Sequence, residues 1–248
     1  MTSESVVDRP ERAVGPGAAA RRRRFADVPA GRMHLWLMVA LTFTTGINDA
    51  VGYLGLDKVF TGNMTGNVVI LGMALVGGTD LPVLGPALAL VGFMVGAVLA
   101  GRSLRGVTAA WSPVTTVILV LVGTTMVGLG GALLLLGDAP GTGAMVTTTT
   151  LAATAMGAQA AAARHVGVKD VSTVVVTSTI TGLAVDSRWG TRKPGGARRL
   201  SAVVAITLGA TAGALALQVH LGVGLLAAGV LVLGITLVGD RHARLTRG

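Results

Sequence analysis

Long apolar stretches make up most of this sequence, and they limit it to the folds that a lipid bilayer permits. Apolar residues account for 52% of the chain and charged residues for 12%, with a mean hydropathy of +0.73. A membrane-spanning helix needs about 20 apolar residues, and backbone groups in hydrocarbon must be hydrogen-bonded within the protein. The sequence therefore predicts an all-α integral membrane protein with no second domain, in contact with the lipid bilayer. Its apolar stretches are 33–56, 58–78, 82–102, 113–136, 143–164, 171–186, 199–219 and 221–239.

Basic residues at the ends of these stretches indicate the topology. The chain has a net charge of +9, but its Lys and Arg lie in tails and short connections, so we expect no nucleic-acid binding. In membrane proteins such residues are concentrated on the cytoplasmic side. The connections at Thr79–Asp80, Asp138 and His220 carry no Lys or Arg. The basic clusters are Arg21–Arg24, Arg102 with Arg105, Arg164 with Lys169, Arg188 to Arg199, and Arg241 to Arg247.

Two layouts of the eight stretches differ in where they place these clusters. If all eight crossed the membrane, the clusters after the third and fifth stretches would be extracytoplasmic, against the positive-inside rule. If the second and sixth stretches enter and leave on one side, every cluster is cytoplasmic and only Lys58 lies outside. We therefore predict about six full crossings plus two broken or re-entrant segments, with both termini cytoplasmic.

The ends of the chain are polar. Residues 1–32 are rich in Pro, Gly and Ala and contain the four-arginine run, which predicts a disordered basic cytoplasmic tail. A signal peptide is the alternative, but the apolar run from Leu35 is long for one and lacks a convincing cleavage site. The membrane domain is then 33–240, and 241–248 form a second cytoplasmic tail.

Glycine is abundant, at 37 of 248 residues. Small residues let helix backbones approach closely in membranes, where lipid-like side chains give little driving force for association. Gly92 and Gly96 are four apart in one stretch, and Gly209 and Gly213 are four apart in another. Both pairs predict close helix contacts.

The two irregular stretches resemble each other. Residues 59–65 (VFTGNMT) align with 171–177 (VSTVVVT) at an offset of 112, and 46–48 (GIN) align with 157–159 (GAQ) at an offset of 111. Each half would then hold one full helix, one irregular segment and two more full helices. Three net crossings is an odd number, so the second half must be inverted, which is a recurrent plan in transporters. The predicted repeat halves are 33–136 and 143–240.

Polar residues inside these apolar stretches are the candidate binding site. An ionisable group at membrane depth is expensive and is by default a functional candidate. Asp49 is either a cation- or proton-binding carboxylate or a structural cap for the broken neighbouring segment. Irregular backbone at membrane depth is tolerated only where it is buried or lines a wet cavity. The candidates for binding a small solute or ion are Asn48, Asp49, Thr61, Asn63, Thr65, Asn67, Gln159, Thr173 and Thr177.

Other chemistry has no visible basis in the sequence. The chain has no Cys, so disulfides, thiolate metal sites and Cys nucleophiles are excluded. The four His residues lie at predicted helix ends without metal-ligand spacing. We predict no catalytic residue, no metal site, no cofactor and no enzymatic activity. The oligomeric state stays open.

Two segments of the sequence carry recognisable motifs. The first holds Gly46-x-x-Asp49-Ala50 and residues 59–67 (VFTGNMTGN), and the second holds Gln159-Ala160-Ala161-Ala162 with Arg164 and Ser172-Thr173 with Thr177 and Thr179. On these motifs the chain resembles the YoaK family, also called the domain of unknown function 1275, over about residues 32–239. The resemblance implies a bacterial inner-membrane protein of about six helices, and it implies no established activity.

These patterns lead to one functional prediction and two alternatives. The prediction is a small-solute or ion transporter in which Asp49 gains and loses a proton or cation during alternating access. The first alternative is a non-transporting membrane scaffold, in which the polar residues only stabilise broken helices. The second is a passive channel.

Overall fold

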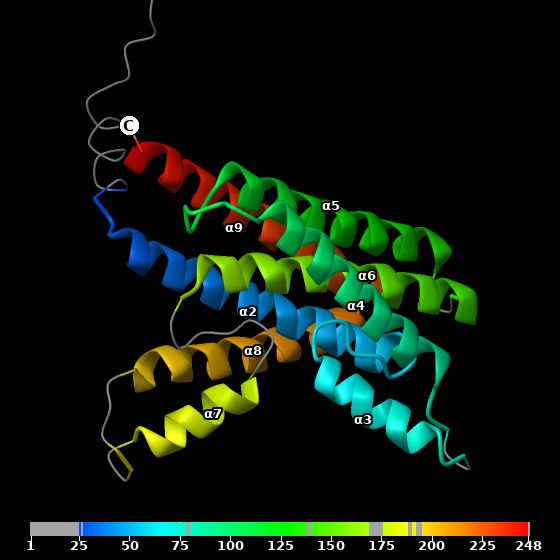
Figure 1. Cartoon of the computed structure of the whole chain (residues 1–248). Helices are drawn as coiled ribbons and strands as arrows, with labels where there is room; N and C mark the ends of the chain where they lie inside the picture. The colour runs from blue at the N-terminus through cyan, green and yellow to red at the C-terminus, as the bar shows by residue number, and fades with distance from the viewer. Residues whose placement is uncertain are drawn as a thin grey trace, which may run out of the picture.

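The structure is a computed structural model that describes residues 25, 27–77, 80–137, 140–168, 176–187, 190–191 and 195–247. These residues form long and short α-helices and contain no strand. In chain order, two series of one long, one short and two long helices follow each other (Figure 1). The helices are α2 (Ala30–Gly55), α3 (Met64–Ala74), α4 (Leu84–Ser103), α5 (Pro113–Leu136), α6 (Thr142–Val166), α7 (Val176–Val185), α8 (Gly196–Leu217) and α9 (Leu221–Arg247).

Among the described residues, five helices are long and apolar enough to cross a bilayer: α2, α4, α5, α8 and α9. α6 has 25 residues and so lies within the length range of these helices, but it is rich in Thr, Ala and Gly and is less hydropathic. Several of its hydroxyls are paired within the helix, as where Thr150 Oγ1 donates to Val146 O (2.7 Å) and Thr154 Oγ1 donates to Thr150 O (2.8 Å). The prediction of an all-helical membrane protein is therefore confirmed, with at least five candidate membrane spans among the described residues.

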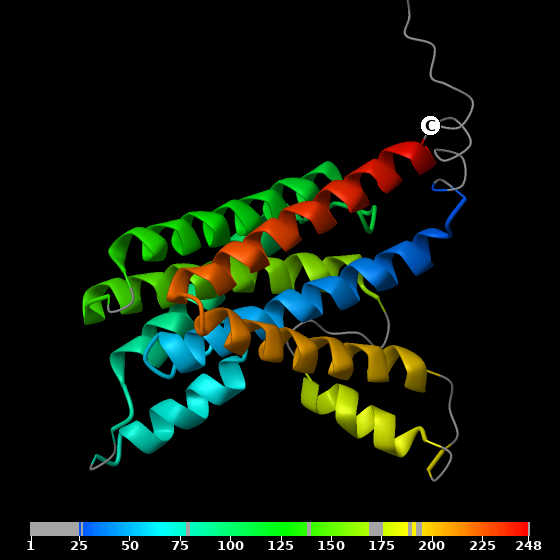
Figure 2. The ribbon, with the colours of Figure 1, turned by 180° about the vertical axis from the view of Figure 1, so that it is seen from behind.

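The short helices α3 and α7 lie on one side of the long helices. Both views show each of them beginning near the middle of the bundle and running outward to opposite ends (Figures 1 and 2). They coincide with the two irregular apolar stretches, and they are 11 and 10 residues long. Helices of this length reach about half way through the hydrocarbon at 1.5 Å per residue.

Three long-helix pairings form most of the bundle: α2 with α8, α4 with α6, and α5 with α9. Glycines permit the close approach in each pairing. A Cβ placed on Gly96 or Gly92 of α4 would come within 3.0 Å of atoms of Thr150 or Thr154 in α6. A Cβ on Gly209 or Gly213 of α8 would be equally close to the backbone of α2. The predicted glycine contacts are therefore confirmed.

Helical structure extends past the predicted membrane domain at both of its ends. α2 begins at Ala30, inside the segment predicted as a disordered tail, and α9 continues into the predicted second tail as far as Arg247. His242 Nε2 lies 2.9 Å from Val28 O, and its ring meets the Phe25 ring edge-on. These contacts join the described residues before α2 to α9.

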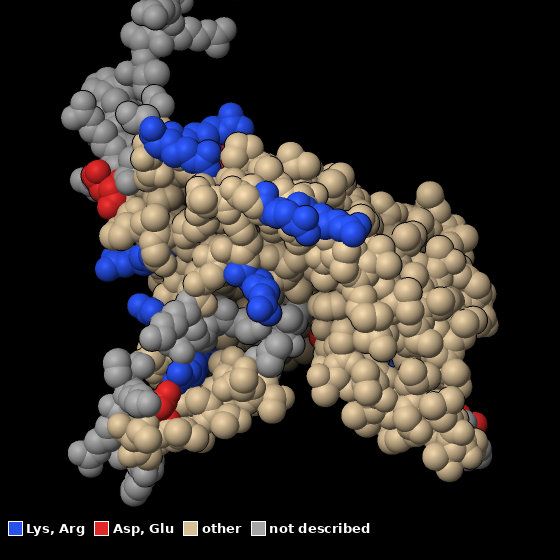
Figure 3. All heavy atoms as spheres, viewed as in Figure 1, with Lys and Arg blue, Asp and Glu red and all other residues tan. Residues whose placement is uncertain are grey.

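Basic side chains gather over the half of the molecule where α2 begins and α9 ends, on the face that Figure 3 shows. The described clusters lie at the end of α4, the end of α6, the start of α8 and the end of α9. The remaining predicted basic residues lie outside the described residues: Arg21–Arg24, Lys169, Arg188, Arg192 and Lys193.

Candidate functional site

Residues Leu56–Ala74 form a hairpin after α2 (Figure 1). Its first part returns the chain toward the middle of the bundle, and its second part is α3. Asn67 closes it, because its side chain accepts from Phe60 N (2.8 Å) and donates to Phe60 O (2.6 Å). Asn63 caps α3, accepting from Gly66 N at 3.2 Å. Asn side chains thus satisfy backbone groups that the break in the helix leaves free.

Asp49 of α2 holds the tip of the hairpin. Its Oδ1 accepts hydrogen bonds from three consecutive backbone N–H groups, those of Thr61 (3.0 Å), Gly62 (2.7 Å) and Asn63 (3.3 Å). The Thr61 hydroxyl adds a fourth contact at 3.4 Å. Successive N–H groups that converge in this way form an anion-binding concavity. Asp49 Oδ1 therefore acts as a cap on the broken segment, which is the structural role considered for this residue in the sequence analysis.

The other carboxylate oxygen has a different environment. Asp49 Oδ2 accepts no hydrogen bond from the described residues, and it is not among their fully enclosed unpaired atoms. The residue as a whole is 9% exposed. One oxygen therefore builds the hairpin, and the other is left for a further partner.

Asn48 and Gln159 lie where α2 crosses α6, and both are completely buried. Asn48 Nδ2 donates to Met156 Sδ (3.2 Å), and Gln159 Nε2 donates to Thr45 Oγ1 (3.3 Å). The Thr45 hydroxyl donates to Leu41 O (3.0 Å), so its oxygen is free to accept. Since thioether sulfur and this hydroxyl oxygen are acceptors, the amide nitrogens must face them.

The two amide oxygens consequently point elsewhere. Asn48 Oδ1 and Gln159 Oε1 are the enclosed side-chain atoms without a hydrogen-bond partner among the described residues. Leaving a buried acceptor unpaired costs about 1–3 kcal/mol. An orphaned pair at one helix crossing therefore marks a place where a ligand would lower the free energy.

The hydrogen-bond partners of these amides, Thr45 and Met156, meet Asp49 around Gly62. A Cβ built there would lie 3.0 Å from the Thr45 methyl group, 3.3 Å from Met156 Cε and 3.4 Å from Asp49 Oδ1. We call Thr45, Asn48, Asp49, Gly62, Met156 and Gln159 the crossing cluster. Its position, at the tip of a hairpin that ends inside the bundle, makes it the candidate functional site.

Only part of the predicted residue set meets at this cluster. Asn48, Asp49 and Gln159 belong to it, while Thr61, Asn63 and Asn67 build the hairpin around it. Thr65 and Thr177 are exposed on α3 and α7, and Thr173 lies outside the described residues.

Two members of the cluster, Thr45 and Met156, were missed by the sequence analysis. Thr45 is three residues before Asn48, on the same face of α2, and Met156 is three residues before Gln159 on α6. The offset of 111 that relates Asn48 to Gln159 also relates Thr45 to Met156. Extending the alignment by one helical turn would have found both.

The matched family covers this whole site. The profile of a family described as "Protein of unknown function (DUF1275)" matches residues 37–238, which include the hairpin and both helices that cross. The chain belongs to the DUF1275 family. The family resemblance drawn from the two sequence segments is thereby confirmed.

A relative of this DUF1275 chain is the UPF0700 transmembrane protein YoaK of Bacillus subtilis (strain 168). The two are 31% identical over 151 residues, which are 60% of this chain and 65% of that protein. The match thus spans somewhat less than two thirds of the relative's length. Together with its five candidate spans, the likeness makes this chain a multi-pass membrane protein. A comparison with solved structures finds no match.

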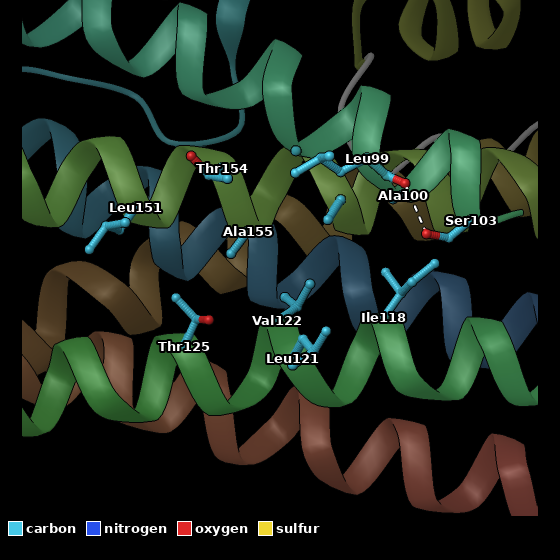
Figure 4. A pocket seen from close by; sticks show the side chains of 12 residues that line it. Leu99, Ala100, Ser103, Ile118, Leu121, Val122, Thr125, Leu151, Thr154 and Ala155 are labelled. Carbon is cyan, nitrogen blue, oxygen red and sulfur yellow. Dashed lines mark hydrogen bonds between the residues drawn. The ribbon is translucent and has the colours of Figure 1, made fainter.

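A second concave feature of the DUF1275 chain lies elsewhere. A cavity of about 270 Å³ opens between α4, α5 and α6 (Figure 4). Its walls are mostly aliphatic, and two of its hydroxyls are paired within their helices, Ser103 with Leu99 O (3.0 Å) and Thr154 with Thr150 O (2.8 Å). No predicted site residue lines it. The cavity offers a polar solute little to bind.

The hairpin geometry gives a first prediction. Asn67→Leu keeps the branched shape but leaves both backbone groups of Phe60 unpaired, so we expect a loss of roughly 2–4 kcal/mol in unfolding free energy. The control is Thr65→Ala, two residues earlier in α3 and exposed, which should change stability by less than about 0.5 kcal/mol. Detergent-solubilised protein unfolded with dodecyl sulfate measures both. Equal effects of the two substitutions would contradict the hairpin contacts.

Proposed function

We propose that this protein is a small-solute or ion transporter of the bacterial plasma membrane that works by alternating access at the crossing cluster. The observation that carries the proposal is a buried carboxylate beside two unpaired amide oxygens, at the tip of a hairpin that ends inside the bundle. Transporters typically bind near the midplane, between structural repeats and at broken helices. The proposal assigns no catalytic residue.

An inverted repeat of 33–136 and 143–240 is part of the proposal, and the helix contacts support it. Exchanging α2, α3, α4 and α5 for α6, α7, α8 and α9 turns the α2–α8 contact into the α6–α4 contact. The same exchange relates α2–α9 to α6–α5 and α3–α4 to α7–α8, and all of these pairs occur. The exception among the described helices is the α8–α9 contact, because its counterpart α4–α5 is at most a marginal contact.

Close contacts repeat residue by residue. The contact of Gly209 in α8 with Phe43 in α2 corresponds to the contact of Gly96 in α4 with Thr154 in α6, and the contact of Gly46 with Ile206 corresponds to that of Gly157 with Phe93. In both cases the α6 residue number is 111 higher than that of its α2 counterpart, and the α8 number is 113 higher than that of its α4 counterpart.

The crossing cluster follows the same rule. An offset of 111 relates Asn48 to Gln159 and Thr45 to Met156, so the Asn48–Met156 contact corresponds to the Gln159–Thr45 contact.

We further propose six full crossings, with α6 as the sixth and with both termini cytoplasmic. α6 packs along α4, which is a candidate span, and carries its basic residues in its last turn. With α3 and α7 re-entrant, every described basic cluster falls on one side and Lys58 on the other, as the positive-inside rule requires.

Cysteine labelling checks this topology without background, because the chain has no Cys. In intact cells, a membrane-impermeant maleimide should label Asp80→Cys and should label Arg105→Cys only after permeabilisation. The reverse pattern would establish eight crossings and remove the re-entrant segments from the proposal.

A non-transporting scaffold is the second candidate, and one observation favours it. The four contacts to Asp49 Oδ1 show that this residue stabilises the hairpin whatever else it does. In a scaffold, that would be its whole role. The unpaired oxygens of Asn48 and Gln159 have no explanation on this reading.

Reconstitution tests the proposed function. Purified full-length protein in liposomes is exposed to a panel of solutes and salts, with a pH-sensitive dye to follow coupled proton movement. Accumulation against a gradient, absent from protein-free liposomes, is the expected result. Flux only down a gradient and without pH dependence would indicate a passive channel, and no flux with any solute would favour the scaffold.

A further inference from the structure

We infer that the crossing cluster binds a small monovalent cation, held by Asp49 Oδ2 and by the amide oxygens of Asn48 and Gln159. The cation is a sodium ion or the ammonium group of a solute, since both present one positive charge to several oxygens at once. This inference rests on the proposed function, because it names the substrate or coupling ion of the same site.

Each donor atom of the crossing cluster already has one acceptor, and each amide nitrogen carries a second N–H besides. The amide nitrogens of Asn48 and Gln159 donate to Met156 Sδ and Thr45 Oγ1, and the Thr45 hydroxyl donates to Leu41 O. The N–H of Gly62 donates to Asp49 Oδ1. The atoms of the cluster that have no partner among the described residues are oxygen acceptors. A ligand that pairs with these oxygens must supply positive charge or donors.

Charge restricts the ligand further. Asp49 is the one ionisable residue of the crossing cluster, which contains no Lys, Arg or His. An anion would be repelled by the Asp49 carboxylate and by the partial negative charge of the two amide oxygens. A divalent cation would leave an uncompensated positive charge at membrane depth, which is expensive. A monovalent cation neutralises the site, and hard oxygen ligands suit such an ion.

A proton alone satisfies the site incompletely. A protonated carboxyl has one O–H to donate, so it could pair with the amide oxygen of Asn48 or of Gln159, but not with both. A sodium ion or an ammonium group takes several oxygen partners at once, and the proposal places the carboxylate and both amide oxygens around it. The two orphaned oxygens, completely buried at one helix crossing, thus favour a cation over a proton.

Thermal unfolding of the purified full-length protein in detergent tests the inference. The melting temperature is compared in sodium chloride, ammonium chloride and N-methyl-D-glucamine chloride at equal ionic strength and fixed pH. At about 100-fold above the dissociation constant, sodium or ammonium should raise it by roughly 5–10 °C over the bulky organic cation. The cation that raises the melting temperature, sodium or ammonium, is the one that the site binds. No response to either overturns the inference.

Two variants locate the response, and a third is the control. Gln159→Met and Asn48→Leu each remove one amide oxygen at similar volume, so they should melt higher than wild type in N-methyl-D-glucamine and lose the cation response. Thr42→Val alters a buried hydroxyl of α2 that bonds Met38 O (2.9 Å), outside the cluster, and should keep the response. A response that persists in both amide variants places the cation elsewhere and overturns the inference.

The outcomes separate this inference from the proposed function. A cation response without flux in any liposome assay would leave the site standing and refute transport. Accumulation of a solute that requires neither sodium nor ammonium, by a protein that shows no thermal response, would leave transport standing and refute the cation site.

Discussion

The Asp49→Asn variant is expected to insert and fold like the wild type but to lower coupled uptake by roughly 10- to 150-fold. The hairpin needs one acceptor from residue 49, because all four contacts go to Oδ1. An Asn side chain keeps that oxygen and replaces Oδ2 with an uncharged donor. An interaction with a charged group contributes about 1.5–3 kcal/mol, so its loss at the binding site lowers uptake by the stated factor.

Uptake into liposomes and melting temperature are measured on the same preparations. Asp49→Leu is the contrasting variant, since it removes the cap as well as the charge and should lower the melting temperature strongly. Unchanged uptake by Asp49→Asn would refute the assignment. If Asp49→Asn and Asn63→Ala both lower the melting temperature while every flux stays intact, the residues serve a scaffold.

The long helices could be predicted from the sequence because hydropathy and charge act over whole turns. The stretch 113–136 coincides with α5, and the stretches at 82–102 and 143–164 fall within two residues of α4 and α6 at each end. The glycine spacings correctly predicted two close helix contacts, and the structure identifies their partners, α6 for α4 and α2 for α8. Helix bounds and glycine spacing depend on residues that are close together in the chain, so a single sequence is enough to predict them.

The short helices and the site were harder to predict. Thr65 and Asn67 both belong to a polar run, yet Thr65 is exposed and Asn67 is 1% exposed, because α3 turns them to different sides. Composition alone does not say which face of a short helix meets the bundle. Thr45 and Met156 resemble ordinary apolar-helix residues, and only the α2–α6 crossing gives them polar partners.

Asp49 illustrates the same limit within one side chain. The sequence left two roles open for it, a ligand for an ion and a cap for a broken helix. The structure assigns the capping contacts to one oxygen and leaves the other oxygen unpaired. The two roles therefore do not exclude each other. This division of labour is what makes Asp49→Asn an informative variant.

Gly96→Ala is expected to destabilise the protein by about 3 kcal/mol or more, which is the largest effect we expect from a single methyl group. Its Cβ would overlap the carbonyl oxygen of Thr154 in α6, and backbone atoms on both sides leave no side chain to move away. Overpacking of this kind costs about 1–3 kcal/mol, and occasionally more. The helices α4 and α6 would have to separate along their contact.

Gly101→Ala on the same helix is the matched control, because nothing lies within 4 Å of a Cβ there. It should be neutral or stabilising by up to about 1 kcal/mol, since Ala favours the helix over Gly. Under the proposed repeat, Gly209 is the counterpart of Gly96, and Gly209→Ala should cost a similar amount through its clash with Phe43 O. Unfolding in dodecyl sulfate measures all three. A neutral Gly209→Ala beside a destabilising Gly96→Ala would mean that the two halves do not pack alike, and the inverted repeat would lose its main support.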